Sequence, residues 1–208
     1  MKRYCFVLLL LIVTTFSVRA QQIMYSSLKA LVEERGDTVS TLRIEKRTKK
    51  LIYLMGGADY RISVDENSGM SRYLKSRCYA VRVDSLLYIN CRKMRYKRYR
   101  FGNWYAPAIQ IRDKIYYVAQ PLGQVASSTT VSANATKLGG EIGDAINVTG
   151  LIDARVYYEL DMQTGKSEFV GKERMKELLS NRPDLLEAFS NETSEEAEVI
   201  GRYLRQIK

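Results

Sequence analysis

Hydrophobic residues over much of the chain follow the two-residue period of half-buried β-strands. The fitting segments are short, and they are separated by Gly, Asp, Asn and Ser, which are typical turn residues. One of them is apolar throughout and ends at Gly56-Gly57. The expected strand segments are 38–47, 51–55, 59–64, 78–91, 108–120 and 154–171. Within 108–120, Arg112-Asp113-Lys114 either continues one long strand or makes a tight turn.

The spacing of three and four residues that is typical of amphipathic helices occurs at both ends of the chain. Residues 23–35 are expected to form a short helix that ends at Gly36, a good C-cap residue. Residues 70–76 fit a further helical turn. The tail, 171–208, is expected to be helical, with Pro183 at the first position of one helix.

Small residues dominate residues 121–150 and set this segment apart from the rest of the chain. Its apolar positions recur at helical steps, and a row of small residues lies beside them. Charged residues interrupt that row, which argues against a membrane span. The segment is therefore expected to be a glycine-lined helix packed on the sheet or a flexible loop. The helical positions are Val131, Ala135, Leu138, Ile142 and Ile146.

Together these elements predict an α+β fold. An antiparallel sheet of hairpins would carry an N-terminal helix, a Gly-rich middle segment and C-terminal helices. Because no stretch resembles a long linker, residues 21–208 are expected to form a single domain.

The first twenty residues have the three parts of a secretory signal peptide. Lys2 and Arg3 precede an apolar run over 6–13, and Val18-Arg19-Ala20 offers a cleavage site before Gln21. The apolar run is too short to span a membrane. We therefore expect an exported protein, periplasmic, envelope-associated or secreted; a retained N-terminal anchor is the alternative.

The charge is positive and unevenly distributed. The 208 residues include 33 Lys and Arg and 23 Asp and Glu, and signal removal would take three basic residues and leave 30 against 23. Residues 21–120 hold 20 basic and 9 acidic residues, whereas 121–208 hold 10 and 14. A basic surface is therefore expected on the first half, part of which could face the acidic second half.

The mature chain would contain two cysteines, Cys78 and Cys91, in an oxidising compartment. If Asp84-Ser85 is a two-residue hairpin turn, Val83 pairs with Leu86, and the same register places Cys78 opposite Cys91. The alternation of pair types makes this a non-hydrogen-bonded pair, with Cα atoms about 4.5 Å apart. A cross-strand disulfide is predicted; two free thiols are the alternative, because Asp-Ser is not a favoured turn pair.

The most conspicuous local feature is a run of cations and aromatic rings over 92–105. Guanidinium groups bind phosphate or carboxylate, and rings stack on sugars, bases or cations. The run predicts an anion-binding surface. The structural alternative is a strand with its cations in solvent and its rings partly inward. The proposed anion-binding residues are Arg92, Lys93, Arg95, Tyr96, Lys97, Arg98, Tyr99, Arg100 and Trp104, with Phe101 and Tyr105 among the interleaved rings.

Catalytic and metal-binding signatures are weak. The chain has no histidine, which excludes Ser-His-Asp and Cys-His relays and any His-ligated metal. Asp59, Asp65 and Glu66 lie near turns, and nothing marks a pair of them as convergent. No phosphate-loop or CxxC pattern occurs. We expect no enzyme activity, no cofactor and no metal; an enzyme that uses carboxylates is the least favoured alternative.

The signal and the tail together carry a family resemblance. The cleavage region before Gln21-Gln22 and the stretches YYELDMQTGKSEF, ERMKELLSNRPDLLEAF and IGRYLRQIK resemble uncharacterised secreted proteins of gut Bacteroidetes, grouped as a domain of unknown function. The resemblance implies an envelope or extracellular location and carries over no catalytic residue. It also implies possible O-glycosylation at Thr38 and Ser85, which fit the short acceptor pattern of that phylum.

These observations favour a non-enzymatic exported protein that works by binding within the bacterial envelope. The first partner expected is an envelope protein that docks on the acidic terminal helices, 184–198. The alternative is an anionic glycan or lipid headgroup bound through residues 92–105. No nucleic acid is expected, because the chain is exported, and no transmembrane span is expected in the mature chain.

Overall fold

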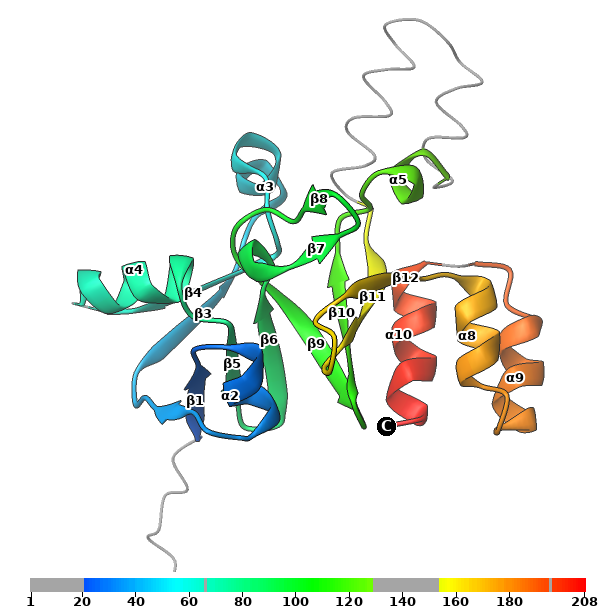
Figure 1. The fold of residues 1–208 in the computed structure, drawn as a ribbon. Helices are drawn as coiled ribbons and strands as arrows, with labels where there is room; N and C mark the ends of the chain where they lie inside the picture. Colours follow the sequence, from blue (N-terminus) through cyan, green and yellow to red (C-terminus); the bar gives the residue numbers. More distant parts are fainter. Residues whose placement is uncertain (1–20, 66, 129–153, 195) are drawn as a thin grey trace, which may run out of the picture.

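A computed structural model describes residues 21–65, 67–128, 154–194 and 196–208, and Figure 1 shows how their helices and strands are arranged. The expected signal peptide and most of the small-residue-rich segment, 129–153, lie outside the described residues. The described part is an α+β fold built on one sheet, as the sequence predicts.

The described strands form one twelve-stranded sheet in which neighbours pair mostly antiparallel. Its main path runs β2-β1-β5-β6-β9-β10-β11-β12-β7-β8, and β3 and β4 branch from β9. The β12–β7 pair is parallel. The strands are β1 (Gln22–Tyr25), β2 (Asp37–Thr38), β3 (Leu42–Lys46), β4 (Tyr60–Val64), β5 (Ala80–Val83), β6 (Leu86–Asn90), β7 (Arg95–Tyr96), β8 (Tyr99–Arg100), β9 (Tyr105–Ile111), β10 (Lys114–Ala119), β11 (Val156–Asp161) and β12 (Ser167–Val170).

Two hairpins are built by local turn chemistry. The β5–β6 register is the predicted one, since Val83 pairs with Leu86 across the Asp84-Ser85 turn. Asp84 has φ 52°, a left-handed conformation that Asp tolerates better than most residues. Arg112 has φ 53°, so Arg112-Asp113 makes the tight turn between β9 and β10, and the long-strand alternative is excluded.

The helices follow their capping signals more closely than the apolar pattern alone. Thr48 accepts a hydrogen bond from the Leu51 amide and begins a helix in a segment that was expected to be a strand. The expected C-terminal helices are present, with Pro183 at a first-turn position. The helices are α2 (Leu28–Val32), α3 (Lys49–Met55), α4 (Ser68–Ser76), α5 (Gln124–Ser128), α8 (Lys172–Leu178), α9 (Pro183–Ser190) and α10 (Ala197–Gln206), and the 3₁₀ turn is η1 (Cys91–Lys93).

The predicted N-terminal helix, 23–35, is wrong over its first turn. Residues 22–25 form β1 because they pair with both β2 and β5, and the helix begins only after Ser27, its N-cap. Glu33, rather than Gly36, is the C-cap. Tertiary pairing therefore overrides the local helical spacing.

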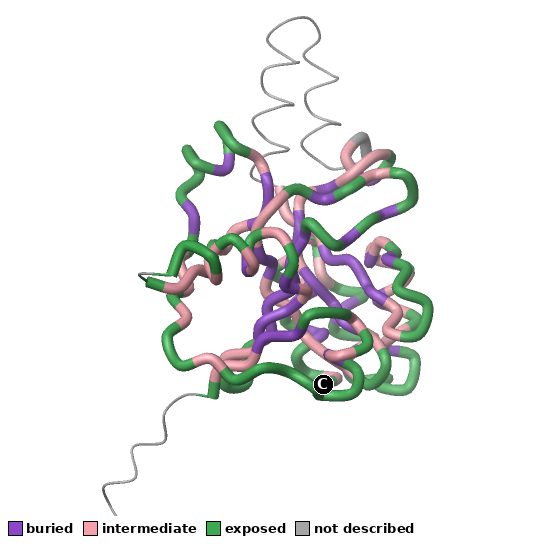
Figure 2. The backbone as a smooth tube through the Cα atoms, turned by 60° about the vertical axis from the view of Figure 1, so that its left-hand side comes forward, coloured by how far each residue is buried: buried purple, intermediate pink, exposed green. Residues whose placement is uncertain are grey.

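Three apolar clusters hold the sheet and helices together. The first cluster contains Tyr25 of β1 and Tyr96 of β7, so the sheet curls until strands far apart in its order share one core. The second cluster packs α8, α9 and α10 on one face of the sheet. The third packs α4 and the β3–β4 hairpin on β5 and β6. Figure 2 shows buried backbone along the sheet strands and exposed backbone in the peripheral loops.

Candidate anion-binding surface

The basic-aromatic run does not form one strand. It begins as η1, continues as the β7–β8 hairpin and returns through residues 101–104 to β9. Arg95 pairs with Arg100 and Tyr96 with Tyr99, so the turn contains only Lys97 and Arg98. The hairpin lies at the upper end of the molecule in Figure 1.

The two kinds of side chain in this run point in opposite directions. Tyr96 and Phe101 are buried in the first core cluster, with ring centroids 5.2 and 4.8 Å from the ring of Tyr158. Tyr105 is also fully buried. The cations are all exposed: Arg92, Lys93, Arg95, Lys97, Arg98 and Arg100. The structure therefore has the orientation of the structural alternative, with cations outward and rings partly inward, but on a hairpin instead of a strand.

None of these six cations forms an ion pair with a carboxylate in the described part of the chain. Lys97 lies 5.3 Å from the ring centroid of Tyr96, and Arg98 lies 5.2 Å from that of Tyr99. Arg98 also donates to the Tyr99 hydroxyl at 3.1 Å. These cation–π contacts hold the turn but leave its positive charge uncompensated.

The hairpin also places like charges directly opposite one another. Arg95 and Arg100 are cross-strand partners, and such pairs destabilise a hairpin. An anion bound between the two guanidinium groups would remove that repulsion. The aromatic anchors Tyr96 and Phe101 keep the hairpin in place despite it.

Trp104 has a different environment from the one expected. Three cations surround its half-buried ring, with Arg47, Arg61 and Lys75 at 5.4, 5.7 and 5.1 Å from the centroid. Tyr99 is similarly engaged, because its ring packs closely on Gly123. Both rings therefore serve as internal contacts, and the cations, more than the rings, are presented to a ligand.

An apolar helix lies next to this surface, and the sequence pattern did not indicate it. The loop after α3 contacts the segment after β8, since the Ala58 amide donates to the Asn103 carbonyl at 2.8 Å. The contact is so close that a Cβ on Gly57 would lie 2.4 Å from that carbonyl oxygen, and Gly57 has φ 88°. The large apolar side chains that α3 exposes are Leu51, Tyr53, Leu54 and Met55.

Arg47 holds the base of α3. It is buried and donates to the carbonyls of Gly56 and Ala58, both at 2.8 Å, and of Leu51 at 3.1 Å. Burial lowers the pKa of its guanidinium, and the nearby Asp59 carboxylate acts in the opposite direction. One side chain thus joins both ends of the α3 loop.

The predicted Cys78–Cys91 disulfide is wrong in this structure, because both cysteines are free and buried. The hairpin ladder ends before them: the Asn90 amide still bonds Tyr79, but Cys91 then enters η1. The Cys78 thiol donates to the Tyr25 and Ala80 carbonyls, and burial raises the pKa of Cys91 to about 12. Neither thiol is poised as a nucleophile at neutral pH.

The acidic candidates are engaged in structural contacts. Asp59 accepts a bidentate pair from Arg155, with Nε–Oδ2 at 3.1 Å and Nη2–Oδ1 at 2.5 Å. Asp65 lies 3.7 Å from Arg43. Glu66 lies outside the described residues. No cluster of acidic or cysteine side chains that could hold a metal is present in the described ranges.

Ion pairs with neighbouring arginines neutralise part of the negative charge of the acidic terminal helices. Asp184 pairs with Arg182 at 2.9 Å, and Glu192 pairs with Arg202 and accepts from the Tyr203 hydroxyl. The apolar faces of these helices pack on the sheet. Within the described residues, the proposed protein-docking surface therefore has fewer uncompensated charges than the basic hairpin.

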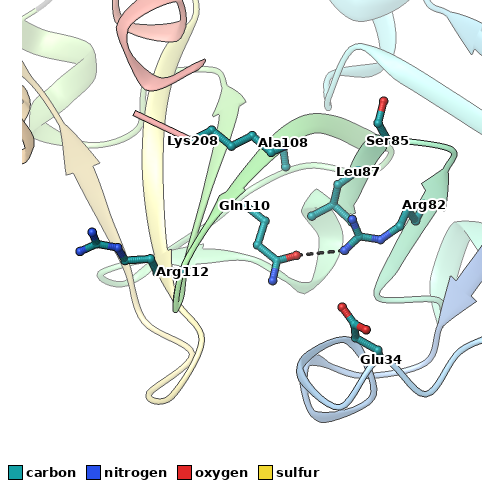
Figure 3. A pocket seen from close by; sticks show the side chains of 8 residues that line it. All are labelled: Glu34, Arg82, Ser85, Leu87, Ala108, Gln110, Arg112 and Lys208. Atoms are coloured by element: carbon teal, nitrogen blue, oxygen red, sulfur yellow. Dashed lines mark hydrogen bonds between the residues drawn. The ribbon is translucent and has the colours of Figure 1, made fainter. Parts of the chain in front are cut away.

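A separate concave site lies between α2, the β5–β6 turn and the β9–β10 hairpin (Figure 3). Its volume is about 270 Å³, and Arg82 donates to Gln110 Oε1 across it at 2.9 Å. Three cations line it against one carboxylate. It is open and shallow, so it lacks the enclosure that small-molecule sites usually have. The lining residues are Glu34, Arg82, Ser85, Leu87, Ala108, Gln110, Arg112 and Lys208.

Among the residues that the structure describes, no helix is long and apolar enough to cross a membrane. Comparisons with curated proteins and with solved structures find no significant match. A protein-family model does match, over residues 23–208, which includes the hairpin, α3 and all three C-terminal helices. The chain therefore belongs to DUF6563, a family of unknown function.

Proposed function

We propose that this protein is an exported, non-enzymatic binding protein of the bacterial envelope, and that it holds an anionic ligand on the β7–β8 hairpin and η1. The export signal and the resemblance to secreted Bacteroidetes proteins support the location. The observation that carries the ligand class is the exposure of six cations with no carboxylate partner in the described ranges. A phosphate, sulfate or carboxylate group is the partner that this charge requires.

The rigidity of the β7–β8 hairpin and η1 also supports anion binding at this surface. Tyr96 and Phe101 anchor the hairpin in the main core, so the cations between them are presented at fixed positions. Asn90 accepts a hydrogen bond from the Arg92 amide at 3.1 Å and begins η1, which places Arg92 and Lys93 beside the hairpin. A preorganised cationic surface binds an anion without first losing backbone freedom.

The test is the binding of residues 21–208 to immobilised heparin, a polyanion, over a series of salt concentrations. The variant R95S/K97S/R98S/R100S should bind at least tenfold more weakly, since each basic residue near an anionic surface contributes about 1 kcal/mol. Its affinity should also depend less steeply on salt, because fewer counterions are exchanged.

A matched variant removes the same charge elsewhere. K29S/R112S/K166S/K208S deletes four exposed cations from α2, the β9–β10 and β11–β12 turns and the C-terminus. Its heparin affinity should stay within about twofold of the parent's, because it loses only the general contribution of net charge. Equal losses for the two variants would show that only net charge matters and would refute a site on the hairpin.

Docking of an envelope protein on the acidic helices is the second proposal. It rests on the acidic composition of 184–198, and the ion pairs of Asp184 and Glu192 weaken it. Cross-linking in intact cells would distinguish this proposal from anion binding, because a protein partner would be cross-linked through lysines near α8–α10.

A further inference from the structure

We infer that the anionic ligand is the surface of a phospholipid bilayer, and that α3 inserts its apolar side chains into that bilayer beside the basic hairpin. This inference rests on the proposed function, since it names the source of the anionic groups. It also gives a role to α3, which the proposal of anion binding by the cations does not involve.

The helix α3 exposes a group of large apolar side chains to solvent. Leu51, Tyr53, Leu54 and Met55 are 45%, 59%, 66% and 70% exposed, and they occur within five consecutive residues. Only Ile52 of this helix is buried. Scattered apolar residues on a surface are ordinary, but a contiguous projecting group of this kind marks an interaction site.

The structure presents this helix rigidly. Arg47 bonds three carbonyls of the loop, and the left-handed Gly56 and Gly57 return the chain to the body of the protein. The helix projects at the same upper end of the molecule as β7 and β8 in Figure 1. A fixed helix of seven residues is about 10 Å long, which is too short to span a bilayer but enough to enter its interface.

Charge complementarity indicates that an anionic bilayer covers the apolar side chains of α3. Lys46 and Lys50 are exposed on and next to the base of α3, and the Asn103 contact joins that base to the segment that follows Arg100. Apolar side chains with cations at their base suit a bilayer interface, where acyl chains cover the apolar groups and anionic headgroups contact the cations. A soluble polyanion such as a glycan would leave the apolar side chains in water.

The experiment measures binding of residues 21–208 to sedimented vesicles made of phosphatidylglycerol and phosphatidylcholine, 3:7, with heparin binding in parallel. In the variant L51S/L54S/M55S, partition to the vesicles should fall by roughly tenfold or more, because three large apolar side chains no longer leave water. Heparin binding should stay within twofold. The matched control V32S/L86S removes the two large apolar side chains that are exposed outside α3 in the described part of the chain, and should leave vesicle and heparin binding unchanged.

Each failure has its own signature. If L51S/L54S/M55S partitions like the parent while the hairpin variant loses both vesicles and heparin, the proposed function survives and the insertion of α3 is overturned. If the hairpin variant keeps both activities, the proposed function itself fails. Equal binding to pure phosphatidylcholine would overturn the charge complementarity, and a parent that binds heparin but no vesicles would overturn the bilayer as ligand.

A spectroscopic readout tests insertion directly and does not depend on a loss of binding. The variant L54W, compared with the parent that carries only Trp104, should shift its added emission to the blue on anionic vesicles. Lipids brominated on the acyl chains should quench that emission. Vesicle binding with no shift and no quenching would show that the protein docks by charge alone and would overturn the inference.

Discussion

The role of Arg47 in holding α3 can be tested by Arg47→Met, which keeps the aliphatic length and removes the guanidinium. The three carbonyl groups are affected differently by the loss of their hydrogen bonds from Arg47. Water can reach those of Gly56 and Leu51, but the Ala58 carbonyl is buried and would be left unpaired. A buried acceptor without a partner costs about 1–3 kcal/mol, and each of the other two bonds contributes about 0.5–1 kcal/mol. We expect the unfolding free energy to fall by about 2–5 kcal/mol.

The lower end of that range applies if the desolvation of Arg47 already offsets part of its bonding, as its lowered pKa indicates. Urea unfolding followed by circular dichroism measures the change. The control is Arg43→Met, whose exposed pair with Glu45 should contribute less than about 1 kcal/mol. Trypsin should also cleave native R47M faster after Lys49 and Lys50. If R47M and R43M agree within about 0.5 kcal/mol, Arg47 does not hold the α3 loop in the way described.

The remaining predictions concern the charge of Asp161 and the state of the two cysteines. The Lys114 ammonium lowers the pKa of Asp161, so this carboxylate contributes stability that is present above its unfolded pKa of about 3.9 and is lost as pH falls through the folded pKa. Asp161→Asn should therefore lower the melting temperature at pH 7 but by progressively less below about pH 4; a difference that is constant with pH would contradict this assignment. Cys78 and Cys91 should react with a chromogenic thiol reagent only after unfolding in urea without reductant, since both are buried and free. Peptide mapping without reduction that finds them joined would restore the disulfide.

Much of the local architecture could be predicted from the sequence because it depends on neighbouring residues. The register of β5 and β6 follows from a two-residue turn, and Pro183 begins a helix because its fixed φ suits that position. The outward cations and inward rings of 92–101 follow from the preference of rings for the core. The candidate anion-binding cations were therefore identified, while their arrangement on a hairpin was not.

The disulfide prediction failed where a local rule was extended beyond its range. The register that pairs Val83 with Leu86 would place Cys78 opposite Cys91 only if both strands continued that far. Instead, Asn90 bonds the Leu74 and Cys78 carbonyls through its side chain and turns the chain into η1. Those contacts come from α4 and its following loop, which hairpin register does not include.

The sequence by itself determined the class of fold, the β5–β6 turn, the helical tail and the existence of a basic, aromatic segment, because each depends on residues close together in the chain. The apolar pattern alone did not decide that 51–55 is a helix, because a short apolar run fits a strand or a helix equally well. There the Thr48 cap and the Arg47 bonds to the Leu51, Gly56 and Ala58 carbonyls select the helix. Only the tertiary structure decided where that helix lies, because a long-range contact between Ala58 and Asn103 brings it beside the cations. The proposed bilayer site therefore depends on two segments about fifty residues apart in sequence, whose proximity only folding creates.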